Sequence, residues 1–230
     1  MKQVINESLI KRNKRIGTIT SILGIAILVA GLIISLKPDP TRTIISFGAL
    51  ILGFIVSQIS TYFVSKFGRS PRFDEILENN LEKLNNDYTF YVYSGPIPLL
   101  LTGPHGIWIP IPIPAAGEIY YQGKWKQRGG NFLLKVFGQE NLGNPEKDIE
   151  ARENEVRSFL EKNLDQEAIP PINSILVAIH PKVTIGEVEE APTPIVPVDA
   201  LRRTIRKYDR KSEIKIQQET LDKIDRLFTK

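Results

Sequence analysis

The sequence predicts an α/β (α+β) domain with a central mixed sheet, preceded by a two-helix transmembrane hairpin. Two uncharged apolar runs, residues 17–36 and 43–65, are each long enough to cross a hydrocarbon core as a helix. Short branched and aromatic runs bounded by Gly and Pro follow them and indicate strands. Amphipathic helical segments are interspersed with these strands, which is typical of a sheet covered by helices.

A short polar segment, residues 37–42, separates the two apolar runs and contains two prolines. A helix cannot continue through these prolines, so the runs are expected to form a helical hairpin. The positive-inside tendency places both termini in the cytoplasm and the connecting loop outside, in a cell membrane crossed twice. The basic residues that flank the hairpin and support this orientation are Lys11, Arg12, Lys14, Arg15, Lys66 and Arg69.

The chain is thereby divided into a basic cytoplasmic leader (1–16), the hairpin (17–65) and a cytoplasmic α/β domain (66–230). The first 65 residues hold seven basic and two acidic residues of the 30 and 26 in the chain, which leaves 23 and 24 for the α/β domain. The basic excess, reflected in a pI of about 9.2, therefore belongs to the anchor. There is no Cys, so the chain has no disulfide, thiolate metal site or Cys nucleophile.

Two alternatives to the hairpin remain open. A cleaved signal peptide fits less well, because the first apolar run is too long and a second one follows it. Two buried helices of a soluble core are the other alternative. Small residues would let the two helices of a membrane hairpin approach closely. These residues are Gly24, Gly31, Gly48 and Gly53.

The first half of the α/β domain is expected to begin with a helix, capped by Ser70, with Pro71 in its first turn, that runs to about Asn85. A β-meander follows, with a tight turn at residues 103–106. The strands expected there are residues 88–93, 97–101, 107–113, 118–121 and 124–126, with a further short strand or loop at 132–137.

The second half is expected to open with a helix after Asn144, and residues 172–179 read as a strand buried on both faces. Residues 183–194 are an acidic loop, and Asp199 is expected to cap a basic helix that ends near Tyr208. The last expected elements are a short strand at 195–198 and an amphipathic helix that carries Ile216, Leu221, Ile224, Leu227 and Phe228.

Four segments give the domain a recognisable pattern: LLLTGPHGIWI (99–109), GEIYYQGKW (117–125), ILVAIHP (175–181) and IVPVDALRRTIRKY (195–208). In this order they resemble the nuclease-related domain (NERD), a bacterial member of the restriction-endonuclease-like superfamily. The resemblance spans roughly residues 73–228 and implies a restriction-endonuclease-like fold. In that family an Asp before the Gly-Pro-x-Gly turn and a Glu-x-Lys after it hold a divalent metal, which activates a water for phosphodiester attack.

The residues at those three positions do not suit this chemistry. Aligning the turn puts Pro98 at the Asp position and Ile111 and Ile113 at the Glu and Lys positions. None of them offers an oxygen ligand, and a shift by one residue again gives only Ile, Leu and Pro. We therefore expect a domain that is not an enzyme, with no catalytic residue, no metal site and no cofactor.

The run Ile-Pro-Ile-Pro-Ile-Pro at residues 109–114 constrains the sheet independently. Alternate residues of a strand direct their N–H groups to the same side, so Pro110, Pro112 and Pro114 remove the donors from one side. Such a strand pairs normally on one side only. It is expected at an edge of the sheet, where proline opposes aggregation. A docking edge for an apolar partner is the alternative.

The densest basic cluster lies on the expected helix after Asp199. A solvated face is the first interpretation, and contact with anionic lipid or nucleic acid is the alternative. His105 and His180 are expected to be structural or solvent-facing, and the pair Glu213 and Lys215, although a literal Glu-x-Lys, is not expected to be catalytic. Trp125 is expected in the core; a small aromatic-basic patch with Lys124, Lys126 and Arg128 is the alternative. The cluster comprises Arg202, Arg203, Arg206, Lys207 and Arg210, with Lys211 just beyond the expected helix end.

Together these patterns favour a membrane-anchored, catalytically inactive nuclease-like domain that acts as a binding or scaffolding module. Its expected partners are the lipid bilayer and a protein that the sequence does not identify. One alternative is an active or residual nucleic-acid-binding nuclease tethered to the membrane. A second is an accessory subunit of a membrane protein complex, with the hairpin supplying the contact.

Overall fold

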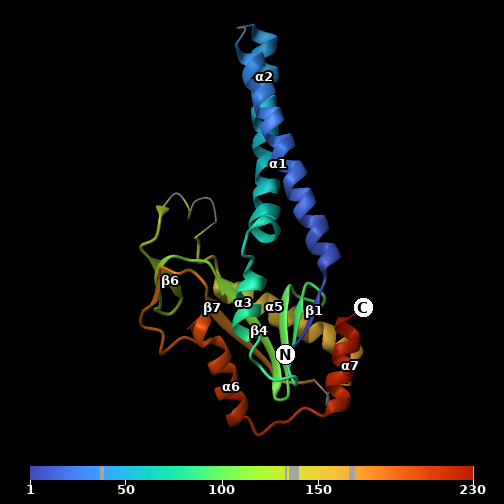
Figure 1. Ribbon diagram of the computed structural model, residues 1–230. Helices are drawn as coiled ribbons and strands as arrows, with labels where there is room; N and C mark the ends of the chain where they lie inside the picture. Colours follow the sequence, from blue (N-terminus) through green and yellow to red (C-terminus); the bar gives the residue numbers. More distant parts are fainter. Residues whose placement is uncertain (37–38, 133, 135–139, 166–168, 230) are drawn as a thin grey trace. The chain divides into compact units, whose positions relative to one another are not determined.

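The computed structural model describes the whole chain except residues 37–38, 133, 135–139, 166–168 and 230 (Figure 1). It separates into two compact units. The first, here called the head, combines Met1–Asn6 with Phe73–Lys230, and the second, the hairpin unit, is Glu7–Arg72. The first six residues thus belong to the head and not, as was predicted, to a separate leader of residues 1–16. Part of the segment 132–137 lies outside the described residues.

The hairpin unit consists of two long helices, α1 (Glu7–Ser35) and α2 (Pro40–Phe63), and a π-helical turn, η1 (Val64–Gly68). Asp39 caps α2, because its carboxylate accepts a hydrogen bond from the Arg42 amide at 3.3 Å. Pro40 follows in the first turn, where a missing N–H costs nothing. Both helices are long and apolar enough to cross a membrane by length and composition, as predicted.

Small residues form the seam between α1 and α2. Ser46 donates its hydroxyl to the Gly31 carbonyl at 2.9 Å, and Ser60 donates to the Gly17 carbonyl at 3.1 Å, so the helices are antiparallel. A seven-residue spacing within each helix keeps this seam on one side of a left-handed supercoil. The buried seam residues are Gly17, Gly24 and Gly31 of α1 and Ser46, Gly53 and Ser60 of α2.

Gly48 does not belong to this seam, and its predicted role in close helix approach is wrong. A Cβ added at Gly48 would meet nothing within 4 Å, whereas one added at Gly31 would lie 2.9 Å from the Ala49 Cβ. Neighbouring positions on a helix point in different directions, so Gly48 faces outward beside Phe47, which is 63% exposed. Large apolar side chains are exposed on the outward faces of both helices, from Leu50 at 42% to Ile44 at 74%.

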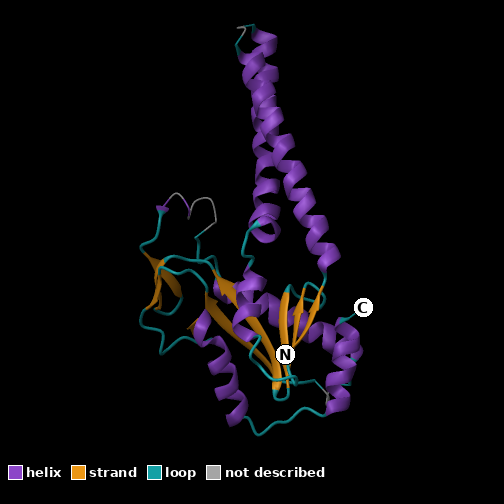
Figure 2. Ribbon diagram, viewed as in Figure 1, coloured by secondary structure: helices purple, strands orange, loops and turns teal. Residues whose placement is uncertain are grey.

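The head is a mixed α/β structure with a central six-stranded sheet (Figure 2). Strands β2, β3 and β4 are antiparallel neighbours, and the other pairs are parallel. The mixed sheet confirms the predicted fold class at this level. The strands, in spatial order, are β1 (Lys2–Ile5), β2 (Thr89–Val92), β3 (Leu99–Gly103), β4 (Gly106–Ile113), β7 (Ile172–Ala178) and β9 (Ile195–Pro197).

Helices pack on both faces of this sheet. On one face, a buried cluster joins Val156 and Phe228 to alternate sheet residues such as Leu100 and Ile109. On the other face, Trp108 meets the Tyr208 ring edge-on at a centroid distance of 5.5 Å. The helices are α3 (Phe73–Leu81), α5 (Pro145–Asn163), α6 (Leu201–Lys211) and α7 (Gln218–Phe228).

The predicted β-meander is wrong beyond its second long strand, because the next hairpin belongs to a separate sheet. That sheet has the order β6 (Trp125–Arg128), β5 (Gly117–Tyr121) and β8 (Val183–Ile185). Gly117, with φ +86°, begins β5 in a backbone conformation that glycine favours. Strand β8 falls within the predicted acidic loop; it pairs with β5 although it is too short to show a strand pattern.

Local helix signals succeeded at one site and failed at two. Asn144 caps α5 through its side-chain oxygen, which accepts from the Lys147 amide at 3.3 Å, as predicted. The first head helix begins at Phe73 instead of after Ser70, and it ends at Leu81. Asp199 lies in a 3-10 turn, η3 (Val198–Ala200), and makes no capping bond to α6.

Strand β4 lies inside the sheet between β3 and β7, so the predicted edge position of the proline run is wrong. The predicted one-sided pairing is nevertheless present. Ile107 donates to the Pro171 carbonyl, and the Ile113 carbonyl accepts from Ile179, so the odd-numbered residues bond to β7. Pro110 and Pro112 point their ring nitrogens toward β3, and the β3–β4 pairing ends at Trp108.

Candidate functional site

The three positions of the nuclease-like motif do not form a polar site. Pro98 is exposed just before β3, whereas Ile111 and Ile113 are 2% and 3% exposed within the core of the head. Within the described part of the chain, no group of three or more His, Cys, Asp or Glu side chains is placed to hold a metal ion. The residues gathered around Ile111 are apolar, including Ile109, so this region serves packing.

The structure gives His180 a carboxylate partner that the sequence analysis did not find. Its Nε2 lies 3.3 Å from Glu140 Oε1, and its Nδ1 accepts the Lys182 backbone N–H at 3.1 Å. Both ring nitrogens therefore have partners within the head, which fits a structural role for His180. Glu140 lies 40 residues earlier in a connecting segment, so no local pattern links the pair.

The aromatic and basic side chains of the β5–β6 hairpin are likewise used within the fold. Trp125 is 6% exposed and packs edge-on against Tyr121 at a centroid distance of 5.4 Å. Arg128 pairs with Glu118 across the two strands at 2.5 Å. The prediction that Trp125 belongs to the core is confirmed.

The basic residues that flank the spans lie at one end of the hairpin unit. Gly17 of α1 faces Phe63 of α2, so the first turns of α1 and the last turn of α2 are adjacent. The Lys66 amine lies 4.3 Å from the centre of the Tyr62 ring and 2.9 Å from its hydroxyl. This shared end of the unit carries Lys11, Arg12, Lys14, Arg15, Lys66 and Arg69.

The predicted basic cluster is gathered by α6 of the head. The helix buries Leu201, Ile205 and Asp209 on its inner face. The basic side chains occupy the rest of its surface; Arg202 is half-buried and the others are exposed. Together they line an open hollow of about 500 Å³. Its lining consists of Arg202, Arg203, Arg206, Lys207, Arg210 and Lys211.

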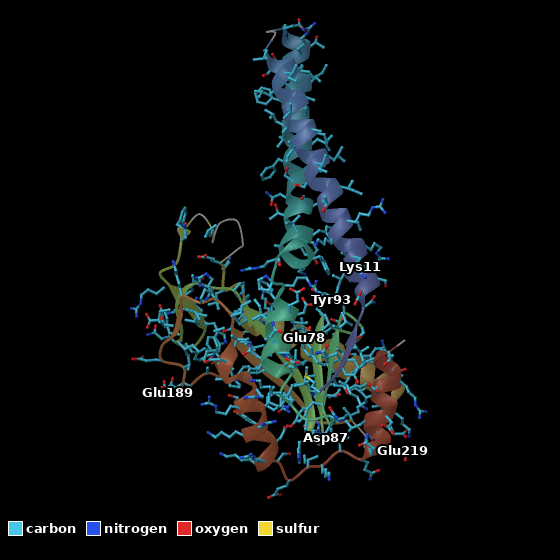
Figure 3. All side chains as sticks on the ribbon, viewed as in Figure 1. Lys11, Glu78, Asp87, Tyr93, Glu189 and Glu219 are labelled. Atoms are coloured by element: carbon cyan, nitrogen blue, oxygen red, sulfur yellow. The ribbon has the colours of Figure 1, made fainter. Side chains whose placement is uncertain are left out.

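A second hollow of about 410 Å³ adjoins the first and shares Arg206 and Arg210 with it. It lies where α6 meets the β3–β4 turn and the start of β2, near Asp87, which Figure 3 labels beside the strand ends. We call it the turn hollow. Its lining comprises Asn85, Asp87, Tyr88, Pro104, His105, Arg206, Asp209, Arg210 and Lys215.

Two backbone-directed bonds hold the floor of the turn hollow in place. The extended segment after α6 is fastened to the β3–β4 turn, because Ile216 donates its amide to the Pro104 carbonyl at 2.8 Å. The His105 Nδ1–H donates to the Ile214 carbonyl, also at 2.8 Å. These bonds hold the backbone on either side of Lys215, and they give His105 the structural role that was predicted.

Both carboxylates of the turn hollow already have partners. Tyr88 donates its hydroxyl to Asp209 at 2.5 Å, and Asn85 donates its amide to Asp87 at 2.6 Å. Burial, followed by the hydrogen bond to Asp209, raises the pKa of the Tyr88 hydroxyl well above its ordinary value. Tyr88 therefore remains a neutral donor near pH 7 and keeps one oxygen of Asp209 occupied.

The cations of the turn hollow are less fully engaged. Arg206 donates to the Lys83 carbonyl at 2.9 Å, which fixes its direction and uses one of its five N–H groups. Among the residues that the structure describes, Arg206, Arg210 and Lys215 have no ion-pair partner. The density of charge on α6 revealed the basic cluster in the sequence. The lining residues from Asn85 to His105 lie 97 or more positions before Arg202, and no sequence pattern linked them to it.

Comparison with known proteins adds no further constraint, since no family model, curated protein or solved structure matches the chain. The structure itself shows a mixed α/β head and two helices suited by length and composition to span a membrane. The surfaces that bear on function are the exposed apolar faces of α1 and α2 and the basic surface of α6.

Proposed function

We propose that the chain is a membrane-anchored binding module, with the hairpin inserted in the cell membrane and the head in the cytoplasm. The observation that carries this proposal is the exposed apolar surface of α1 and α2. Side chains such as Ile22 and Phe54 are 65% and 61% exposed on two helices whose buried residues, apart from Ile10, are all Gly or Ser. Continuous apolar surface of this kind is unfavourable in water and favourable in lipid.

The polar groups of the hairpin support the same location. Between its first and last turns an α-helix satisfies its backbone groups internally, as a lipid environment requires. The seam hydroxyls of Ser46 and Ser60 also donate to carbonyls of α1. The basic residues at the shared end of the hairpin would then face the cytoplasm, together with both chain termini.

We further propose that the head resembles the restriction-endonuclease-like domain and binds a partner without catalysing phosphodiester cleavage. Ile111 and Ile113 support this reading, because they occupy the expected metal-binding positions with buried apolar side chains. An unidentified protein is the favoured partner. Stoichiometric recovery of another integral membrane protein from mild detergent would instead support the accessory-subunit alternative.

Nucleic-acid binding is a second candidate, and the basic surface of α6 favours it. A polyanion that contacted these side chains would release counterions and bind with a steep dependence on salt. Titration of the full-length protein in nanodiscs with an oligonucleotide between 50 and 200 mM salt tests this candidate. Weak or salt-insensitive binding would exclude it, and Mg²⁺-dependent cleavage by homogeneous protein would contradict the non-catalytic proposal.

The membrane topology can be tested cleanly because the native chain has no Cys. Single cysteines are introduced at Thr41, beside the connecting loop, and at Glu219, in the first turn of α7. A membrane-impermeant maleimide should label Thr41→Cys in intact spheroplasts and label Glu219→Cys only after permeabilisation. Equal labelling of both variants before permeabilisation, or release of the protein by alkaline carbonate, would refute insertion in this orientation.

A further inference from the structure

We propose that the turn hollow is a binding site for a phosphate group carried by a small ligand. The inference deepens the proposed binding role of the head by naming a ligand chemistry, and it does not depend on how the hairpin is inserted. Its basis is an excess of positive charge: three cations and two carboxylates line the hollow, and each carboxylate already accepts a hydrogen bond from another lining residue.

The positive groups come from two different segments. Arg206 and Arg210 are one helical turn apart on α6, so their side chains lie on the same face. Lys215 belongs to the extended segment after α6, which the β3–β4 turn holds through its contacts with Pro104 and His105. The hollow therefore receives positive charge from two sides instead of from a single helix.

The two carboxylates offset two of the three positive charges of the lining, which leaves one positive charge in excess, and each carboxylate already accepts a hydrogen bond from a neutral neighbour. Asp209 is 7% exposed and accepts the Tyr88 hydroxyl, and Asp87 accepts the Asn85 amide. The side chains of Arg210 and Lys215, by contrast, make no hydrogen bond or ion pair within the described part of the chain. Arginine presents a planar set of donors that suits phosphate oxygens, and lysine adds a mobile point charge.

The size of the hollow favours a small ligand over an extended surface contact. Its volume of about 410 Å³ lies within the range of pockets that hold small molecules, roughly 300–1,000 Å³. The neighbouring hollow on α6 is lined by six basic residues without any other side chain type, as expected for a solvated face. The turn hollow differs because it adds Asn85, Tyr88 and His105 beside the cations.

The test uses the full-length protein in nanodiscs of zwitterionic lipid, with inorganic phosphate as the first probe. Binding is measured by calorimetry and by thermal unfolding of the head, at constant ionic strength with chloride as the reference anion. Phosphate should bind saturably and raise the unfolding temperature, since a ligand that binds only the folded state stabilises it. The double variant Arg210→Gln/Lys215→Gln should weaken binding by about tenfold or more, as expected when charge-assisted contacts are lost.

The matched control is Lys207→Gln/Lys211→Gln, which removes the same charge from the neighbouring hollow and leaves the lining of the turn hollow intact. It should change phosphate affinity by less than about threefold, as expected for screened surface charges. Equal losses in both double variants would show diffuse attraction to α6 and overturn the proposal. No saturable phosphate effect would overturn it as well.

A second set of measurements distinguishes a lipid headgroup from a soluble ligand as the source of the phosphate. Nanodiscs that contain phosphatidic acid replace free phosphate, and the same two double variants are compared. Stabilisation that is lost only in Arg210→Gln/Lys215→Gln would assign the phosphate to a lipid headgroup; stabilisation by free phosphate alone would assign it to a soluble ligand. An oligonucleotide that binds with equal dependence on both variant pairs would contradict a discrete site. The Cys-labelling test of topology is independent, so either proposal can fail while the other stands.

Discussion

The close approach of α1 and α2 can be tested at a single glycine. Replacing Gly31 with Ala places a methyl group 2.9 Å from the Ala49 Cβ, at least 0.5 Å short of the 3.4 Å at which ordinary contact begins. Both atoms are attached directly to helix backbones, so the clash cannot be relieved by rotating a side chain. We expect the helices to separate slightly and the Ser46–Gly31 hydrogen bond of 2.9 Å to weaken.

The expected magnitude follows from a comparison with Gly48→Ala. Both changes gain the same helix propensity, roughly 0.5–1 kcal/mol, so this contribution cancels between the two variants. Overpacking at Gly31 costs about 1–3 kcal/mol, and a weakened interhelical hydrogen bond adds about 0.6 kcal/mol. Gly31→Ala should therefore be less stable than Gly48→Ala by the sum of these two costs, roughly 1.6–3.6 kcal/mol.

The assay is unfolding of the hairpin by increasing mole fractions of SDS in mixed micelles. Cysteines are introduced at Thr18 and Ser65, which are both exposed near the shared end of the hairpin unit. Energy transfer between dyes on these cysteines reports the separation of the two helices. The double variant Gly31→Ala/Ala49→Gly removes the methyl group that would clash and should recover much of the lost stability. Equal stability of Gly31→Ala and Gly48→Ala, or no recovery in the double variant, would refute the seam.

Two further predictions concern the head. Burial and the hydrogen bonds to Asp209 and Asp225 raise the pKa of the Tyr88 and Tyr91 hydroxyls. Their contribution to stability is therefore complete below about pH 10, the unfolded value, and is lost as the pH rises through the folded pKa values. Chemical unfolding at pH 8–11 should show this decline, and the Tyr88→Phe/Tyr91→Phe variant should flatten it. If the double variant lost stability with rising pH as steeply as the native protein, the two tyrosines would not be the source of the decline. Separately, Ile111→Ala should lower the free energy of unfolding by about 2–5 kcal/mol, because it removes a buried side chain. Pro98→Ala should lower it much less, because Pro98 is exposed.

Features encoded within a few residues could be predicted from the sequence. The cap of α5 at Asn144 was recognised because the side chain bonds to an amide only three residues away. The buried strand β7 was recognised from a continuous apolar run, and α1 and α2 from their length without charge. Each of these signals reflects a local physical requirement.

Features that depend on distant partners could not be predicted. Strand β1 is a strand because Lys2–Ile5 pairs with Thr89–Val92, and its four residues carry no pattern of their own. The pairing of Glu140 with His180 could not be predicted either, because the two residues are far apart in the sequence. In the candidate site, charge density revealed Arg206 and Arg210, but it could not show which hollow they enter.

The proline run connects these observations to the placement of the candidate site. Pro110 and Pro112 remove the N–H groups that β4 would direct toward β3, so the two strands pair only from Gly106 to Trp108. Strands β3 and β4 are therefore paired with each other only near the turn that connects them. Strand β4 is paired with β7 from Ile107 to Ile113. The turn between β3 and β4 carries Pro104, whose carbonyl holds the segment that contains Lys215. The turn hollow therefore lies beside the end of β3 and β4 at which these strands are paired, and the turn between them holds the segment that carries Lys215 through Pro104 and His105.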